Sequence, residues 1–119
     1  MFRWVGFNKE GVREMKHIDI YGYKFQVCFV NKNDERIRGN DGLCLHNEFT
    51  IYIRNDLDKT MQRCVLRHEI THAILCLQGR CYHNKFTQED LCEFVAFQSV
   101  YICKKVDEIM RGKKIKTIN

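Results

Sequence analysis

Apolar and polar residues alternate in the first half of the chain and recur at helical spacing in the second half. The segment His17–Val30 is rich in Ile, Tyr, Phe and Val, which predicts a strand that bends at Gly22. The polar segment 31–41 ends in a Gly-Asn-Asp-Gly run that is typical of a loop. These features predict that the chain begins with β-structure.

Two shorter strands are predicted next. Leu43–Leu45 and Phe49–Ile53 flank a polar turn at 46–48, and apolar residues alternate with Thr and Tyr in the second of them. A period of two is typical of a strand that is buried on one face. We therefore expect a hairpin at 43–53.

Two long helices are predicted after the hairpin. Apolar residues recur at steps of three and four from about Lys59 to Gln78, and the polar segment 55–58 offers residues for the N-cap. Thr87 begins a second helix, with Asp90 placed to form a capping box, and this helix continues to about Met110. The second half of the chain is therefore predicted to be mainly helical.

The order of strands, helix, loop and helix predicts an α+β fold. We expect a small antiparallel sheet packed against the first helix and against a second, long C-terminal helix. A length of 119 residues predicts a single domain over 1–119. No apolar run approaches the roughly 20 residues that span a bilayer, and the first residues do not resemble a signal peptide, so we expect a cytoplasmic protein without a membrane segment.

The cysteines are numerous for this length. There are seven, at irregular spacing and without a CxxC pair, which favours reduced thiols that act as small buried hydrophobes. A disulfide framework is the alternative. Six of them lie within apolar stretches: Cys28, Cys44, Cys64, Cys76, Cys92 and Cys103.

The net charge is +5, and much of the excess lies between residues 104 and 116. Such an excess can attract an acidic partner or a nucleic acid. No aromatic residue is interleaved with these basic residues, so we interpret them as a solvated helix end and tail rather than as a nucleic-acid surface.

The candidate metal-binding and catalytic residues lie in the first predicted helix. His68 and His72 are four residues apart, so both imidazoles lie on one face, where a single Zn²⁺ can accept them. Glu69 can reach a water that the metal activates and act as its general base. The alternative is a surface helix with two incidental histidines, but the apolar flanks of the HExxH motif favour a metal site.

A third ligand is expected downstream, because a catalytic zinc has about three protein ligands and one open position. Glu89 and Glu93 are one turn apart on the second helix, and Glu93 is embedded in an apolar stretch. We assign Glu89 as the ligand, with Glu93 accepting a hydrogen bond from a ligand histidine. The reverse assignment, a role for His83 on the metal, and a helix-dipole role for Glu89 are the alternatives.

The HExxH segment at 68–72 together with Glu89, Glu93 and the pair Val95-Ala96 resembles the gluzincin metallopeptidases. The resemblance is to the ImmA/IrrE family and to small zincin-like proteins of bacteriophages, and it covers about residues 42–102. It implies a minimal zincin-like fold, with Glu89 at the position of the ligand glutamate. It also implies that the edge strand of the 42–53 segment aligns the substrate chain.

These residues predict a zinc-dependent metallopeptidase with Zn²⁺ as cofactor and a protein or peptide substrate, such as a regulatory protein. Because no helix-turn-helix or second domain accompanies the motif, and because Glu93 replaces the asparagine typical of the ImmA/IrrE helix, no particular substrate follows from the resemblance. The alternative is a zinc-supported, catalytically weak or inactive protein that binds and regulates a host protein. A nucleic-acid-binding domain ranks last.

Overall fold

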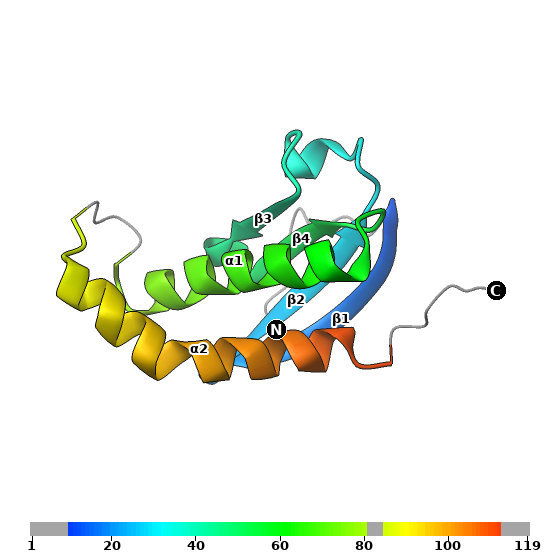
Figure 1. Cartoon of the computed structure of the whole chain (residues 1–119). Helices are drawn as coiled ribbons and strands as arrows, with labels where there is room; N and C mark the ends of the chain where they lie inside the picture. Colours follow the sequence, from blue (N-terminus) through cyan, green and yellow to red (C-terminus); the bar gives the residue numbers. More distant parts are fainter. Residues whose placement is uncertain (1–9, 81–84, 113–119) are drawn as a thin grey trace.

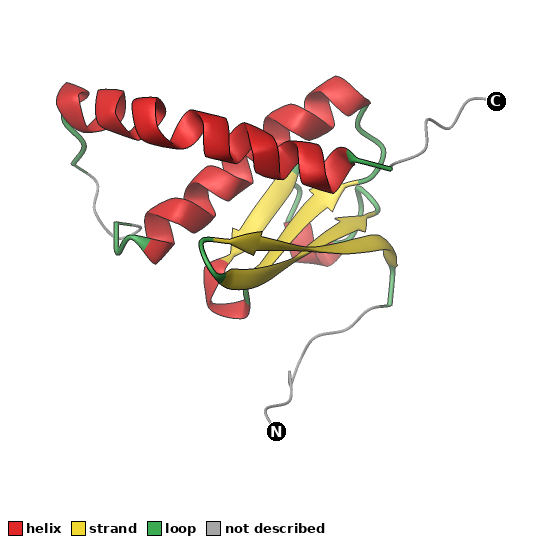
Figure 2. Cartoon of the chain, turned by 90° about the horizontal axis from the view of Figure 1, so that it is seen from below, coloured by secondary structure: helices red, strands yellow, loops and turns green. Residues whose placement is uncertain are grey.

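The computed structural model describes residues 10–80 and 85–112, which form a four-stranded sheet and two long helices on one of its faces (Figures 1 and 2). The α+β class expected from the sequence is confirmed. The elements in chain order are β1 Val12–Ile20, β2 Tyr23–Val30, the 3-10 helix η1 Glu35–Ile37, β3 Gly42–Leu45, the 3-10 helix η2 His46–Glu48, β4 Thr50–Arg54, α1 Lys59–Leu77 and α2 Gln88–Met110.

The sheet has the order β1-β2-β4-β3, and it is mixed rather than antiparallel. β1 pairs with β2 and β3 pairs with β4 in antiparallel fashion, but β2 and β4 are parallel. The expectation of an antiparallel sheet is therefore wrong for the central pair. The physical reason is that β4, buried from Thr50 to Ile53, takes the central position beside β2. The chain first crosses to edge strand β3 and then turns back into β4, so β4 runs in the same direction as β2.

The segment His17–Val30 forms parts of two strands, so the prediction of one bent strand is wrong. Tyr21 and Gly22 both have positive φ, +48° and +91°, and Ile20 pairs directly with Tyr23. Two consecutive residues with positive φ are typical of a type I′ hairpin turn. The first strand also extends back to Val12, beyond the predicted start.

The predicted hairpin and the two predicted helices are confirmed. Side chains form the N-caps of both helices. The side chain of Asp58 accepts a hydrogen bond from the Met61 backbone N–H at 2.8 Å at the start of α1. At the start of α2, Thr87 and Asp90 form the predicted capping box through two hydrogen bonds of 3.0 Å each. These side chains satisfy backbone donors that the first turn of a helix leaves unpaired.

The main hydrophobic core lies between the sheet and the two helices. Phe25 and Phe29 of β2, Leu66 and Ile70 of α1 and Ile109 of α2 are all fully buried there. On α2 the buried residues come only from the second half of the helix. The first half diverges from the end of α1, as Figure 2 shows, and it carries apolar side chains with exposed fractions between 53% and 76%: Leu91, Val95 and Phe97.

The cysteines differ in part from the expectation. Cys64, Cys92 and Cys103 are exposed free thiols, so the prediction that the cysteines are buried is wrong for these three, whereas Cys28 is buried. Cys64 on α1 and Cys92 and Cys103 on α2 occupy helix positions that face solvent rather than the core. No helix in the described ranges is long and apolar enough to span a membrane.

Candidate metal and active site

The two histidines of the HExxH motif converge on each other at the solvent-exposed surface of α1. Their Nε2 atoms are 3.2 Å apart, and the rings are nearly perpendicular at 74°. Two nitrogen ligands of a tetrahedral zinc, each about 2.0–2.1 Å from the metal, lie about 3.3 Å from each other. The separation also corresponds to a hydrogen bond between the rings, which one neutral tautomer can donate to the other. The two Nε2 atoms therefore have the separation expected of two ligands of one zinc ion, without a rearrangement of α1.

Burial lowers the pKa of His72, and the neighbouring His68 lowers it further. A lowered pKa means that the neutral imidazole is favoured at neutral pH. Because a metal binds the neutral form, this environment reduces the competition between protons and metal for His72.

Glu69 lies against the start of edge strand β3, with its Cγ atom close to Gly42. Only 6% of the residue is exposed, and it lies between α1 and β3. Burial raises the pKa of its carboxyl group, while His68 and a backbone hydrogen bond from Cys44 act in the opposite direction. A carboxyl group with a raised pKa is a stronger base, which suits proton transfer near neutral pH.

Strand β3 lies close against α1 because residue 42 is glycine. A Cβ added to Gly42 would be 2.6 Å from Cγ1 of Val65 and 3.2 Å from Cγ of Glu69. No side chain larger than hydrogen fits without a shift. Further along β3, Cys44 is desolvated enough to raise the pKa of its thiol to about 12. The Cys44 thiol is therefore neutral at physiological pH and is not a nucleophile.

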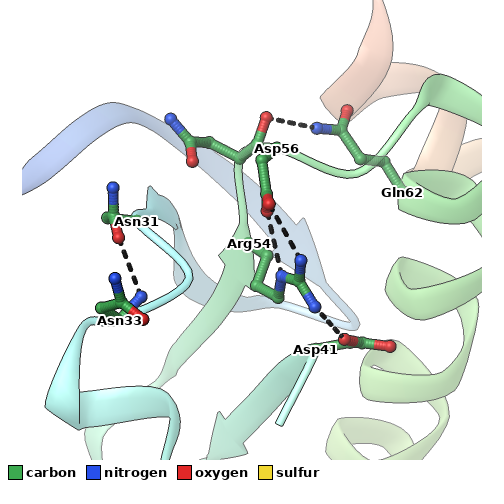
Figure 3. A network of polar contacts seen from close by, with 7 residues as sticks. Asn31, Asn33, Asp41, Arg54, Asp56 and Gln62 are labelled. Atoms are coloured by element: carbon green, nitrogen blue, oxygen red, sulfur yellow. Dashed lines mark hydrogen bonds and ion pairs between the residues drawn. The ribbon is translucent and has the colours of Figure 1, made fainter. Parts of the chain in front are cut away.

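The start of β3 is held by an ion-pair network. The guanidinium of Arg54 donates to Asp41 at 2.8 Å and to both carboxylate oxygens of Asp56 at 2.9 Å (Figure 3). Arg54 also donates its backbone N–H to the carbonyl oxygen of Asp41 at 3.0 Å. These bonds fix the end of the 31–41 loop beside α1.

A groove of about 320 Å³ opens between this loop and α1, next to the motif. It is lined by Asn40, Asp41, Gly42, Met61, Cys64, Val65, His68 and Glu69. The sequence indicated only a loop at Gly39–Gly42, so the contribution of Asp41 to a pocket was missed. The signal that could have found it is the glycine directly before a predicted edge strand, which allows close approach to another element.

The two downstream glutamates are not grouped with the histidines. Among residues 10–80 and 85–112, no three His, Cys, Asp or Glu side chains are arranged to hold one metal ion. Glu89 and Glu93 are both exposed on the first half of α2, so the expectation that Glu93 is embedded is wrong. Glu93 instead lines a small groove with Gln78 and Arg80. His83, the alternative ligand, lies outside the described residues.

Comparison of the chain with protein-family models, with curated proteins and with solved structures gave no match. The interpretation of the site therefore depends on the residues and geometry of this chain. Those are an imidazole pair with zinc-ligand spacing, a buried carboxylate beside it, and an edge strand next to both.

Proposed function

We propose that this protein is a zinc-dependent metallopeptidase. The observation that carries the proposal is the 3.2 Å separation of the Nε2 atoms of His68 and His72, with the buried carboxylate of Glu69 between the same helix and edge strand β3. His68 and His72 would hold the ion through Nε2. When bound, zinc polarises the scissile carbonyl group and makes water a nucleophile at neutral pH.

The chain's own residues supply proton transfer and substrate alignment. In the proposal the Glu69 carboxylate takes a proton from the attacking water and passes it to the leaving amine. In the part of the chain that the structure describes, β3 is an edge strand, so its outer backbone groups, apart from the Cys44 N–H that bonds to Glu69, would pair with an extended peptide.

In this proposal Glu89 is the third ligand and Glu93 accepts a hydrogen bond from a ligand histidine. The first half of α2 would then have to lie closer to α1 than it does in the structure. Leu91 and Val95 lie on the same helical stripe as buried Ile102, whereas Glu89 and Glu93 lie roughly opposite that stripe, so α2 would also have to rotate for them to face the histidines.

The first test is the metal content of the purified protein, measured by mass spectrometry. We expect about one zinc per chain in the wild type, loss of zinc in the His68→Ala/His72→Ala double variant, and retention of zinc in His17→Ala. His17 is an exposed histidine on β1 and serves as the matched control. Absence of zinc from the wild type after zinc is supplied would overturn the proposal.

The second test is turnover of the Glu69→Gln variant. We expect this variant to keep its zinc and to lose peptide cleavage by roughly 10²- to 10⁴-fold, the usual contribution of a general base. Peptide cleavage at the wild-type rate would show that Glu69 is not the base.

A second candidate function is a zinc-supported protein that binds and regulates a host protein. The exposed apolar residues of α2, among them Phe97 and Val100, favour it, because contiguous exposed apolar surface is typical of protein interaction sites. The Glu69→Gln variant separates the two candidates. A binding protein would keep its biological effect in this variant, whereas a peptidase would lose it.

A further inference from the structure

The groove beside the HExxH motif has an apolar wall and an acidic rim. Met61 and Val65 of α1 provide the apolar surface, and the groove reaches His68 and Glu69 at its other end. Met61 and His68 are seven residues apart, which corresponds to about 10 Å along the helix. The volume of the groove, about 320 Å³, lies at the lower end of the range for ligand pockets.

The charge of the groove is opposite to that of the whole chain. Its lining includes two carboxylates, Asp41 and Glu69, but no lysine or arginine, although the net charge of the protein is +5. The nearby cation Arg54 does not neutralise the rim fully, because one guanidinium is shared between Asp41 and Asp56 (Figure 3). The network of these three side chains keeps a formal charge of −1.

We propose that this groove binds a long cationic side chain, Arg or Lys, of a peptide substrate. The inference rests on the proposed peptidase function, since the groove would then select a residue near the bond to be cleaved. The methylene groups of such a side chain pack on Met61 and Val65 while its charge stays at the solvated rim beside Asp41. A guanidinium can also form charge-assisted hydrogen bonds with the Asp41 carboxylate.

The test uses binding of small probes and does not require turnover. The chain contains four methionines, so the ¹³C-labelled methyl group of Met61 is a simple NMR reporter that a Met61→Leu variant identifies. The probes are N-acetyl-arginine amide and N-acetyl-citrulline amide, which have the same length and differ in charge. We expect arginine to shift the Met61 resonance with at least fivefold higher affinity than citrulline.

Asp41→Asn and Asp56→Asn are matched variants, because both remove a carboxylate that pairs with Arg54 but only Asp41 lines the groove. We expect Asp41→Asn to abolish the preference for arginine and Asp56→Asn to change it less than twofold. Equal affinities for arginine and citrulline, or equal effects of the two variants, would overturn the inference. Arginine binding without cleavage of any peptide would support the groove and count against the peptidase function instead.

Discussion

Glu69 is a buried carboxyl group on a helix that also faces water, and its burial makes the stability of the protein depend on pH. Its raised pKa, caused first by burial, means that the folded state holds its proton more tightly than the unfolded chain does. At acidic pH, below the unfolded-state pKa of about 4.3, Glu69 is protonated in both states and does not reduce the free energy of unfolding. As pH rises through that value towards the folded pKa, ionisation of Glu69 reduces the free energy of unfolding.

We therefore predict that Glu69→Gln stabilises the metal-free protein at pH 7 and has little effect near pH 4. The amide removes the cost of a buried charge while keeping a similar volume. The measurement is urea denaturation of the wild type and the variant at both pH values in the presence of a chelator. A variant that is less stable than the wild type at pH 7 would show that the hydrogen bond to Cys44 outweighs the cost of burial.

At the scale of elements, the contact between β3 and α1 positions the candidate site. Strand β3 is short, from Gly42 to Leu45, and it pairs with β4 on one side only. Its position depends on the close approach at Gly42, where the Cγ1 atom of Val65 occupies the space that a side chain would need. The geometry around Glu69 therefore depends on Gly42, which has no side chain that could take part in a reaction.

We predict that Gly42→Ala destabilises the protein by about 1–3 kcal/mol, the usual cost of overpacking. The added methyl group would lie 2.6 Å from Cγ1 of Val65, so the strand or the helix must shift. Denaturant unfolding measures the loss. The control is the Gly42→Ala/Val65→Ala double variant, which removes the colliding atom and should be more stable than the sum of the two single effects predicts.

The packing of α2 differs between its two halves. Its second half is anchored to the core and to β1, where the Lys16 ammonium donates to the carbonyl oxygens of Ile109 and Arg111 at 2.7 Å each. Its first half has a complete capping box but few buried side chains. The capping box therefore determines where α2 begins. In the proposed functions, packing of the first half of α2 against α1 depends on a metal ion or a partner.

At the scale of the whole molecule, the main core lies between the sheet and the helices, and the buried residues that α2 contributes to it all lie in its second half. We predict that Leu66→Ala costs about 2–5 kcal/mol, as is usual for a fully buried leucine. Val100→Ala should change stability by less than about 0.5 kcal/mol, because 69% of Val100 is exposed. Thermal or urea unfolding of both variants tests this. A large loss in Val100→Ala would mean that α2 is packed differently in solution.

The sequence by itself determined the local features of this protein. The sequence predicted the two helices, the N-cap Thr87, an N-cap within segment 55–58 and the 43–53 hairpin, because each depends on residues close together in the chain. The pairing of His68 with His72 was predicted for the same reason, since helical spacing alone brings residues four apart together.

Only the tertiary structure decided which strands are neighbours and how the helices cross. The parallel pairing of β2 with β4 and the edge position of β3 depend on burial of β4 between distant segments, which no local pattern encodes. The exposure of Glu89 and Glu93 depends on which side of α2 packs on the core, since both lie roughly opposite buried Ile102 around the helix. The groove at Asp41 likewise exists because a loop, a strand and a helix far apart in sequence meet at Gly42, where the absence of a side chain allows them to approach.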